Sequence, residues 1–203
     1  MKALFPTLIH FEKLSFRQRA QLNRELLADI HTIQKLDLEG RRWSKTNYVG
    51  GYTSYASQTQ LHRTHHPFMV LSKAIDSHVR RYARQLHWDL KGGRLEMTTC
   101  WVNVMPKFSH HSLHLHPLAV VSGTYYVQTP KEGGTLKFED PRIGLFMGSP
   151  PRKASAPKEV QPFYSLQPET GKIVLFESWI RHEVPANRGN EKRISISFNY
   201  EWV

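Results

Sequence analysis

The sequence lacks the cysteine pairs that stabilise many secreted domains. Its 203 residues include one cysteine, Cys100, so no internal disulfide can form. Cys100 lies in an alternating apolar stretch, where we expect it to be a small buried hydrophobic residue. A single thiol fits a reducing compartment, and we predict a cytoplasmic protein.

Long apolar runs are also missing. Residues 1–6 are followed by no extended apolar region before His10 and Glu12, so we expect no signal peptide. No segment approaches the roughly 20 apolar residues that a membrane-spanning helix needs, so we expect no membrane partner. With 39% hydrophobic and 22% charged residues, the composition is that of an ordinary globular chain.

Acidic residues are scarce relative to basic ones. The chain has 17 Asp and Glu against 28 Lys and Arg, which gives a formal net charge of +11. This excess favours anionic partners such as nucleic acid, an acidic protein or an anionic metabolite. No compact Lys/Arg run is present, so a basic, well-solvated surface is an equal alternative and nucleic acid is not excluded.

Hydrophobic periodicity predicts a helical first part. Residues 15–18 form a capping box, and apolar residues then recur at helical spacing, which predicts a helix over about 16–36. Pro67 suits a helix start, and the apolar face that follows predicts a second helix ending near Gly92. We interpret the polar stretch 41–66 between the two helices as a loop.

From residue 94 onward the period changes to two, which is typical of β-strands. Pro and Gly separate five predicted strands, at residues 95–104, 119–128, 135–138, 172–176 and 193–201. A proline-rich loop lies at about 144–162. We therefore predict a single domain over 1–203, in which a helical N-terminal support region (1–93) backs a β core (94–203).

The histidine pattern is the strongest functional signal. Alternate side chains of an extended strand share a face, so His114 and His116 can point at one spot. The strand at 172–176 delivers His182 just past its end, and three converging imidazoles suit a divalent transition metal such as iron. Five other histidines have no partner spacing and are interpreted as surface or helix-packing residues: His62, His65, His66, His78 and His87.

The last predicted strand has an unusual polar face. Its alternate residues Arg193, Ser195, Ser197 and Asn199 share one side, while the other side is apolar. An arginine with three polar residues is an odd face for a packed core. The pattern predicts that this face lines a polar cavity holding an anionic ligand.

Together these motifs resemble the Fe(II)/2-oxoglutarate-dependent oxygenases, and are most similar to the bacterial and phage group described as "putative 2OG-Fe(II) oxygenases". The resemblance spans nearly the whole chain. It rests on GRRWS (40–44), GYTSY (51–55), WVNV (101–104), HLHP (114–117), SGTYYV (122–127), FEDPR (138–142), FESW (176–179), His182 and RISISFNY (193–200). It implies a mainly β fold, a double-stranded β-helix (jelly-roll, cupin-like) barrel backed by two α-helices.

The resemblance also implies an activity. A member of this family is a dioxygenase that uses Fe(II), dioxygen and 2-oxoglutarate to hydroxylate a substrate, with oxidative decarboxylation of 2-oxoglutarate to succinate. The implied site residues are His114, His116 and His182 for iron, and Arg193, Tyr126 and Ser195 for 2-oxoglutarate. The primary substrate is not named: a peptide side chain, a nucleobase and a small metabolite all stay open.

One position departs from the family pattern. The usual facial triad joins two histidines and one carboxylate, and His116 stands at the carboxylate position. Two alternatives for the ligand set follow: His111 in place of His114, or a carboxylate from Glu139 or Asp140.

Two alternative functions follow as well. A three-histidine dioxygenase that needs no cosubstrate would oxidise a small carboxylate held by Arg193, and a non-catalytic cupin would only bind a metal or ligand. Repair of alkylated nucleic acid is disfavoured. The members of the family that carry out such repair usually have a second arginine six residues after the first, and this chain has Asn199 at that position.

Overall fold

The computed structural model describes residues 2, 4–14 and 19–203, so the expected capping box at 15–18 lies outside the described residues. The helices are α1 (Arg19–Leu36), α2 (Leu38–Asn47), α3 (Leu61–Thr64), α4 (His66–Gln85) and the short 3-10 turns η1 (Ile143–Leu145) and η2 (Lys158–Val160). The strands are β1 (His10–Lys13), β2 (Tyr52–Thr53), β3 (Leu95–Met105), β4 (His111–His114), β5 (Val121–Gln128), β6 (Leu136–Glu139), β7 (Phe163–Leu166), β8 (Lys172–Glu177), β9 (His182–Val184) and β10 (Arg193–Trp202).

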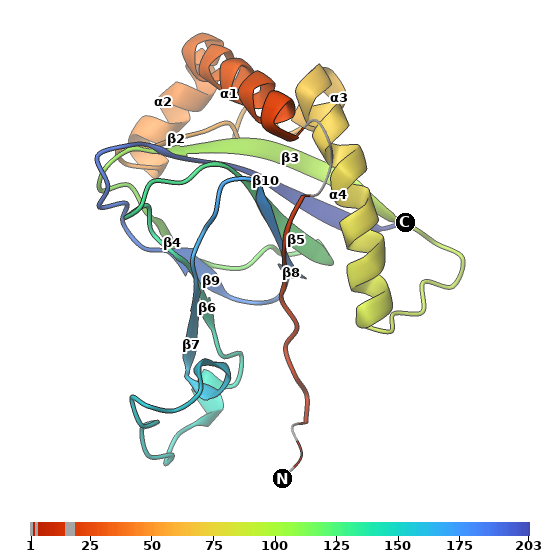
Figure 1. The fold of residues 1–203 in the computed structure, drawn as a ribbon, viewed down its shortest axis with the longest axis vertical. Helices are drawn as coiled ribbons and strands as arrows, with labels where there is room; N and C mark the ends of the chain where they lie inside the picture. Colours follow the sequence, from red (N-terminus) through yellow and green to blue (C-terminus); the bar gives the residue numbers. More distant parts are fainter. Residues whose placement is uncertain (1, 3, 15–18) are drawn as a thin grey trace.

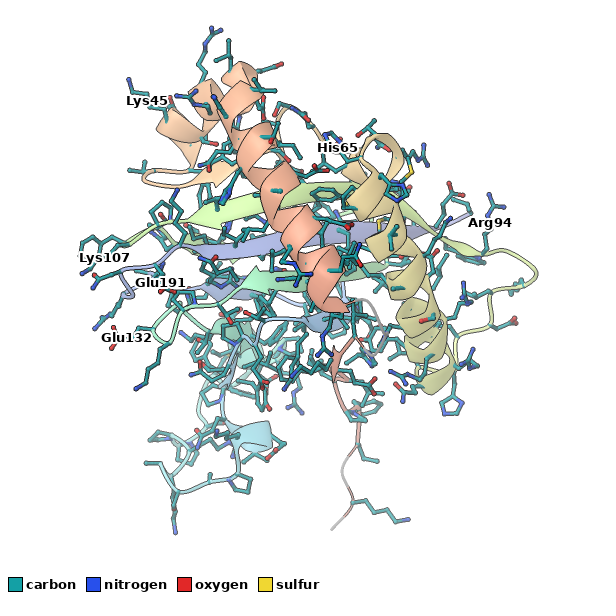
Figure 2. All side chains as sticks on the ribbon, turned by 45° about the horizontal axis from the view of Figure 1, so that its top comes forward. Lys45, His65, Arg94, Lys107, Glu132 and Glu191 are labelled. Carbon is teal, nitrogen blue, oxygen red and sulfur yellow. The ribbon has the colours of Figure 1, made fainter. Side chains whose placement is uncertain are left out.

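The two helices predicted from periodicity are confirmed as α1 and α4, although α4 ends at Gln85 and not near Gly92 as predicted. The expected apolar residues of α1 are buried, as are those of α4, which has Pro67 in its first turn. Both helices lie across the same face of a large sheet, over β3, β10 and β5 (Figures 1 and 2). Charged side chains such as Lys45, Arg94 and Lys107 extend outward from the periphery, consistent with the net charge of +11 (Figure 2).

The prediction of a continuous loop over 41–66 is wrong, because this stretch contains most of α2 and all of β2 and α3. Asp37 caps α2 and organises the segment: its Oδ1 accepts from the backbone N–H of Gly40 at 2.9 Å. Its Oδ2 accepts from the hydroxyls of Tyr52 at 2.8 Å and Ser57 at 2.6 Å. Tyr52 and Ser57 lie 15 and 20 positions after Asp37 in the sequence. The polar composition of the segment therefore gave no sign of these bonds.

The strands form two antiparallel sheets, a fold that is mainly β with few helices. The major sheet has the order β1-β8-β5-β10-β3-β2, and the minor sheet has the order β4-β9-β6-β7. The five predicted strands are confirmed within two residues as β3, β5, β6, β8 and β10, whereas β1, β2, β4, β7 and β9 were not predicted individually. The missed strands have four residues or fewer, too short for a clear alternating pattern.

The alternation of β10 divides the interior into two layers. Its apolar residues Ile194, Ile196 and Phe198 pack with α1 and α4 on the outer face of the major sheet. A second apolar cluster, including Met105, Tyr126 and Phe138, fills part of the space between the sheets. The polar residues of β10 face this second layer, where a cavity separates the two sheets.

The proline-rich segment connects β6 to β7 and carries η1 and η2. It extends away from the two sheets at one end of the molecule (Figure 1). Among the described residues, no helix combines the length and the apolar character that crossing a membrane requires.

Candidate metal and cosubstrate site

Three histidines meet beside the β4–β9 pair at one edge of the minor sheet. His114, the last residue of β4, pairs directly with His182, the first residue of β9. The ring centroids are 4.4 Å apart for His114 and His182, 5.1 Å for His116 and His182, and 5.3 Å for His114 and His116. One ring nitrogen from each residue lies within 4.8 Å of the others, so the three side chains can share one metal ion.

The backbone brings these histidines together in a different way from the predicted strand. Because β4 ends at His114, His116 lies beyond the strand and not on its alternating face. A hydrogen bond of 3.0 Å from the His116 backbone N–H to the Ser178 carbonyl fixes this turn. The convergence therefore depends on the contact with Ser178 as well as on strand pairing.

The second ring nitrogen of each histidine is held by an acceptor. Each Nδ1 lies near a carbonyl oxygen: Ser112 O at 2.6 Å from His114, Ile180 O at 2.9 Å from His182, and Asn199 Oδ1 at 2.6 Å from His116. A carbonyl oxygen can only accept, so Nδ1 carries the proton in each ring. The Nε2 atoms keep their lone pairs, as metal ligation requires.

Burial keeps two of the rings neutral. Removal from water, followed by the nearby His114, lowers the pKa of His182 from 6.5 to about 3. Burial also lowers the pKa of His116, although its hydrogen bond to Asn199 acts in the opposite direction. Neutral imidazole is the form that binds a metal, so these histidines need no deprotonation near pH 7.

Arg193 is a buried cation in the same cavity. It is 2% exposed, and the hydrogen-bond partners of its Nη1 among the described residues are Ser195 Oγ and Met105 Sδ, both at 3.3 Å. Its Nε atom has no hydrogen-bond partner, and no ion pair joins it to a carboxylate in the described part of the chain. Its guanidinium carbon lies 5.1 Å from the centroid of the Tyr126 ring. A buried guanidinium with free donors has the chemistry that suits an anionic ligand.

Other buried polar atoms around Arg193 are also unpaired. The Tyr126 hydroxyl is fully buried and has no hydrogen-bond partner by distance and angle among the described residues, and burial raises the pKa of this phenol while the adjacent Arg193 acts in the opposite direction. Asn103 Oδ1 and Thr124 Oγ1 are likewise unpaired among the described residues. Native interiors rarely leave such groups unsatisfied, and the Tyr126 and Thr124 hydroxyls can donate to ligand oxygens, whereas Asn103 Oδ1 can only accept. A dicarboxylate such as 2-oxoglutarate can accept from these two hydroxyls and from Arg193, but it offers no donor to Asn103 Oδ1.

A cavity of about 340 Å³ connects Arg193 with the three histidines. The polar face of β10 lines it as the sequence predicted: Arg193, Ser195, Ser197 and Asn199 all reach this space. Arg193 is the one Lys, Arg, Asp or Glu among its described lining residues. The rest of the wall is neutral, with an aromatic contribution from Trp43, Tyr48, Tyr55 and Trp101 that the sequence analysis did not single out.

The alternative ligand His111 is engaged elsewhere in the cavity wall. Its ring stacks on Tyr48 with centroids 4.4 Å apart, and its Nε2 lies 2.8 Å from the Tyr48 hydroxyl. Burial, followed by the charge of Arg193, lowers the pKa of His111 to about 3. Its ring centroid is 6.2 Å from that of His114, so His111 lies beside the three histidines and not among them.

The alternative carboxylates are held by arginines. Glu139 pairs with Arg181 at 2.8 Å, and Asp140 pairs with Arg142 at 2.8 Å. Neither residue is among the described residues that group with the three histidines. The geometry therefore offers three imidazoles and no carboxylate as the ligand set.

Comparison with known proteins agrees with this geometry. Residues 99–199 match the family described as "Putative 2OG-Fe(II) oxygenase". No curated protein matches the sequence.

Several solved structures share the fold. A prolyl-4-hydroxylase from Pseudomonas putida has 16% identity and a TM-score of 0.61, over 96% of this chain and 92% of that one. A prolyl hydroxylase from Trichoplax adhaerens, in complex with a hypoxia-inducible-factor peptide, has 17% identity and a TM-score of 0.64, over 95% and 83%. HygX from Streptomyces hygroscopicus, with nickel, 2-oxoglutarate and hygromycin B, has 13% identity and a TM-score of 0.62, over 96% and 83%.

Proposed function

Because this chain belongs to the 2OG-Fe(II) oxygenase family, we propose that His114, His116 and His182 hold Fe(II) and that Arg193 anchors 2-oxoglutarate. In this proposal the enzyme hydroxylates a substrate that is not yet identified. Its partners are dioxygen, 2-oxoglutarate and that substrate. The cytoplasmic location expected from the sequence stays a prediction.

The observation that carries the proposal is that Arg193 is buried with no carboxylate partner among the described residues. A guanidinium that is 2% exposed loses most of its hydration, and an unpaired buried charge is costly. A ligand that supplies the missing anion would offset this cost. The distal carboxylate of 2-oxoglutarate can accept two parallel hydrogen bonds from the planar guanidinium.

The other residues around Arg193 complete the binding site. Ser195 supports the guanidinium from the same face of β10, and the free Tyr126 hydroxyl can donate to the same carboxylate. The three Nε2 atoms hold the metal at the other end of the cavity. Fe(II) and 2-oxoglutarate, when bound, supply the oxidative decarboxylation to succinate and carbon dioxide that accompanies substrate hydroxylation. The protein contributes positioning and a cavity that restricts water.

His116 changes the charge of the site relative to the usual triad. Three neutral imidazoles leave both positive charges of Fe(II) uncompensated, whereas a carboxylate would neutralise one. The dianionic cosubstrate then has more charge to neutralise at this site. We expect metal and 2-oxoglutarate to bind with strong mutual dependence.

The cavity favours a neutral substrate group. Trp101, next to His116, is 7% exposed, and Tyr55, which packs edge-on against Trp101, is 52% exposed. Both rings line the cavity, and Trp43 adds another aromatic side chain to the lining. Since Arg193 is committed to the cosubstrate, no described lining residue is left to pair with an anion. We therefore propose that a flat, uncharged group, such as a ring, enters this cavity.

The test is oxygen uptake by the purified protein with Fe(II), ascorbate and 2-oxoglutarate. We expect 2-oxoglutarate-dependent oxygen consumption with succinate formation, at a slow uncoupled rate that a true substrate raises. Because His116 replaces the usual carboxylate, a second function is a three-histidine dioxygenase that needs no cosubstrate. Such an enzyme would consume oxygen without forming succinate. Absence of both oxygen uptake and 2-oxoglutarate binding by calorimetry would contradict the proposal.

A further inference from the structure

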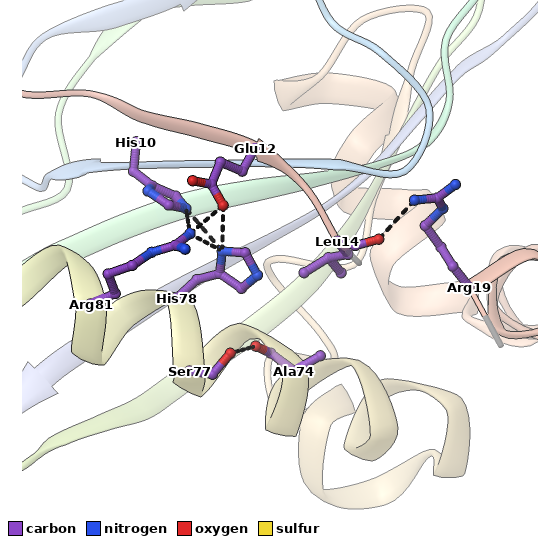
Figure 3. A network of polar contacts seen from close by, with 8 residues as sticks. All are labelled: His10, Glu12, Leu14, Arg19, Ala74, Ser77, His78 and Arg81. Carbon is purple, nitrogen blue, oxygen red and sulfur yellow. Dashed lines mark hydrogen bonds and ion pairs between the residues drawn. The ribbon is translucent and has the colours of Figure 1, made fainter. Parts of the chain in front are cut away.

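A second group of metal-binding side chains lies between β1 and α4, apart from the first three histidines. His10 and Glu12 alternate along β1 and share one face, while His78 and Arg81 lie one helical turn apart on α4. Figure 3 shows the four side chains converging on one point. The sequence analysis interpreted His78 as an incidental histidine, because only the fold brings β1 against this helix.

The distances suit a small divalent ion. His10 Nε2 lies 2.9 Å from His78 Nδ1, and Glu12 Oε2 lies 3.8 Å from the same His78 atom. Zinc–nitrogen and zinc–oxygen bonds of about 2.0–2.2 Å in a tetrahedron put neighbouring ligand atoms roughly 3.3 Å apart. The two observed separations lie on either side of this value, and two imidazoles with one carboxylate are a common zinc donor set.

Arg81 already brings a cation to this point. Its Nη2 lies 3.2 Å from His78 Nδ1 and 3.4 Å from His10 Nε2, and it pairs with Glu12 Oε2. One guanidinium nitrogen therefore contacts all three donor atoms. The Arg81 side chain is 40% exposed, so its head group can move into water and keep its hydration.

The imidazoles are available to a metal. His10 is 6% exposed, and this burial lowers its pKa to about 4, so its ring is neutral near pH 7. The close approach of His10 Nε2 and His78 Nδ1 requires a proton on one of these nitrogens. Transfer of this proton to the other nitrogen of the same ring frees both lone pairs without changing the net charge.

We propose that His10, Glu12 and His78 form a second site for a divalent transition-metal ion, with Zn²⁺ as the preferred occupant, in which the ion takes the place of the Arg81 guanidinium. The ion would join β1, the edge strand beside β8, to α4 on the outer side of the major sheet. The proposal is independent of the oxygenase activity, because it uses none of the residues of the first site.

The test is a metal titration of the full chain without a polyhistidine tag. Co²⁺ serves as a spectroscopic probe of tetrahedral coordination, and Zn²⁺ competition gives affinity. We expect two equivalents in the wild-type protein, one in His78→Ala and in Glu12→Gln, and retention of the second site in His182→Ala. Glu12→Gln is the safer variant for folding, because Glu12 is exposed.

Arg81 provides a sharper test. Arg81→Leu removes the competing cation and should tighten Zn²⁺ binding at this site at least tenfold. Arg81→Lys is the matched control, since it keeps a positive charge and should change affinity less. A wild-type protein that binds only one equivalent, or a His78→Ala variant that still binds two, would overturn the proposal. Loss of oxygenase activity alone would not, because it reports on the first site.

Discussion

The Nδ1 atom of His116 lies 2.6 Å from Oδ1 of Asn199, a residue 83 positions later in the chain. Ser122 joins the same group, with its hydroxyl 2.8 Å from Asn199 Oδ1 and 2.7 Å from Ser178 Oγ. This network contacts the Nδ1 side of the His116 ring, opposite the Nε2 atom that is proposed to bind the metal. Asn199 therefore orients a proposed ligand from the strand that also carries Arg193.

Asn199→Leu should weaken Fe(II) binding by about 10- to 100-fold, because the His116 ring loses the acceptor that sets its tautomer and orientation. Asn199→Asp keeps an acceptor and should retain most of the affinity. Anaerobic titration with Fe(II) or Mn(II) measures both. Equal metal affinity in the leucine variant and the wild type would show that the hydrogen bond does not orient a ligand.

His182→Ala and His116→Ala should each lose iron binding while the protein stays folded. His116→Asp restores the commoner triad and should retain iron, with unchanged or faster 2-oxoglutarate turnover. Metal content after gel filtration, with circular dichroism as the folding control, distinguishes the outcomes. Full iron occupancy in either alanine variant would refute the proposed ligand set.

Arg193→Leu should weaken 2-oxoglutarate binding at least tens-fold, since each hydrogen bond to a charged group contributes roughly 1.5–3 kcal/mol. Arg193→Lys should rescue binding only in part, because an ammonium lacks the planar fork. Calorimetry under anaerobic Mn(II) gives these affinities. An unchanged affinity in the leucine variant would contradict the assignment of Arg193.

The same substitution makes a prediction about stability. Without ligand, Arg193→Leu should unfold at the same or a higher temperature than the wild type, because it removes an unpaired buried cation. With Mn(II) present in both samples, adding 2-oxoglutarate should then raise the Tm of the wild type more than that of the variant. A residue needed for the fold alone would give a lower Tm in the variant in both conditions.

The metal-free protein should lose stability as the pH falls below neutral. Burial lowers the pKa of His111 and of His182 from 6.5 to about 3, so the unfolded chain binds more protons than the folded one between these values. The free energy of unfolding should therefore fall between about pH 6.5 and pH 3, by up to about 1.4 kcal/mol per pH unit for each histidine.

Urea unfolding at pH 7.5, 6.0 and 5.0 tests this dependence. His111→Gln should reduce its slope, whereas His87→Gln, at an exposed residue after α4, is the control that should leave the slope unchanged. An identical slope in His111→Gln and the wild type would mean that the buried ring does not resist protonation.

The sequence by itself determined the elements with long, regular patterns. Apolar residues at helical spacing predicted α1 and α4, and the alternation in β10 predicted both its buried apolar face and its cavity-lining polar face. These predictions succeeded because each depends on the periodicity of a single segment, which is local information. The family motifs came from the sequence as well, and the match over 99–199 agrees with them.

Only the tertiary structure decided which distant side chains meet. Asp37 organises α2 and β2 through bonds to Tyr52 and Ser57, and the polar stretch around them gave no local signal of a helix. His10 and His78 are 68 residues apart, and their contact depends on how β1 lies beside α4. The free donors of Arg193 were likewise invisible in the sequence, because whether a buried charge has a partner depends on every segment packed around it.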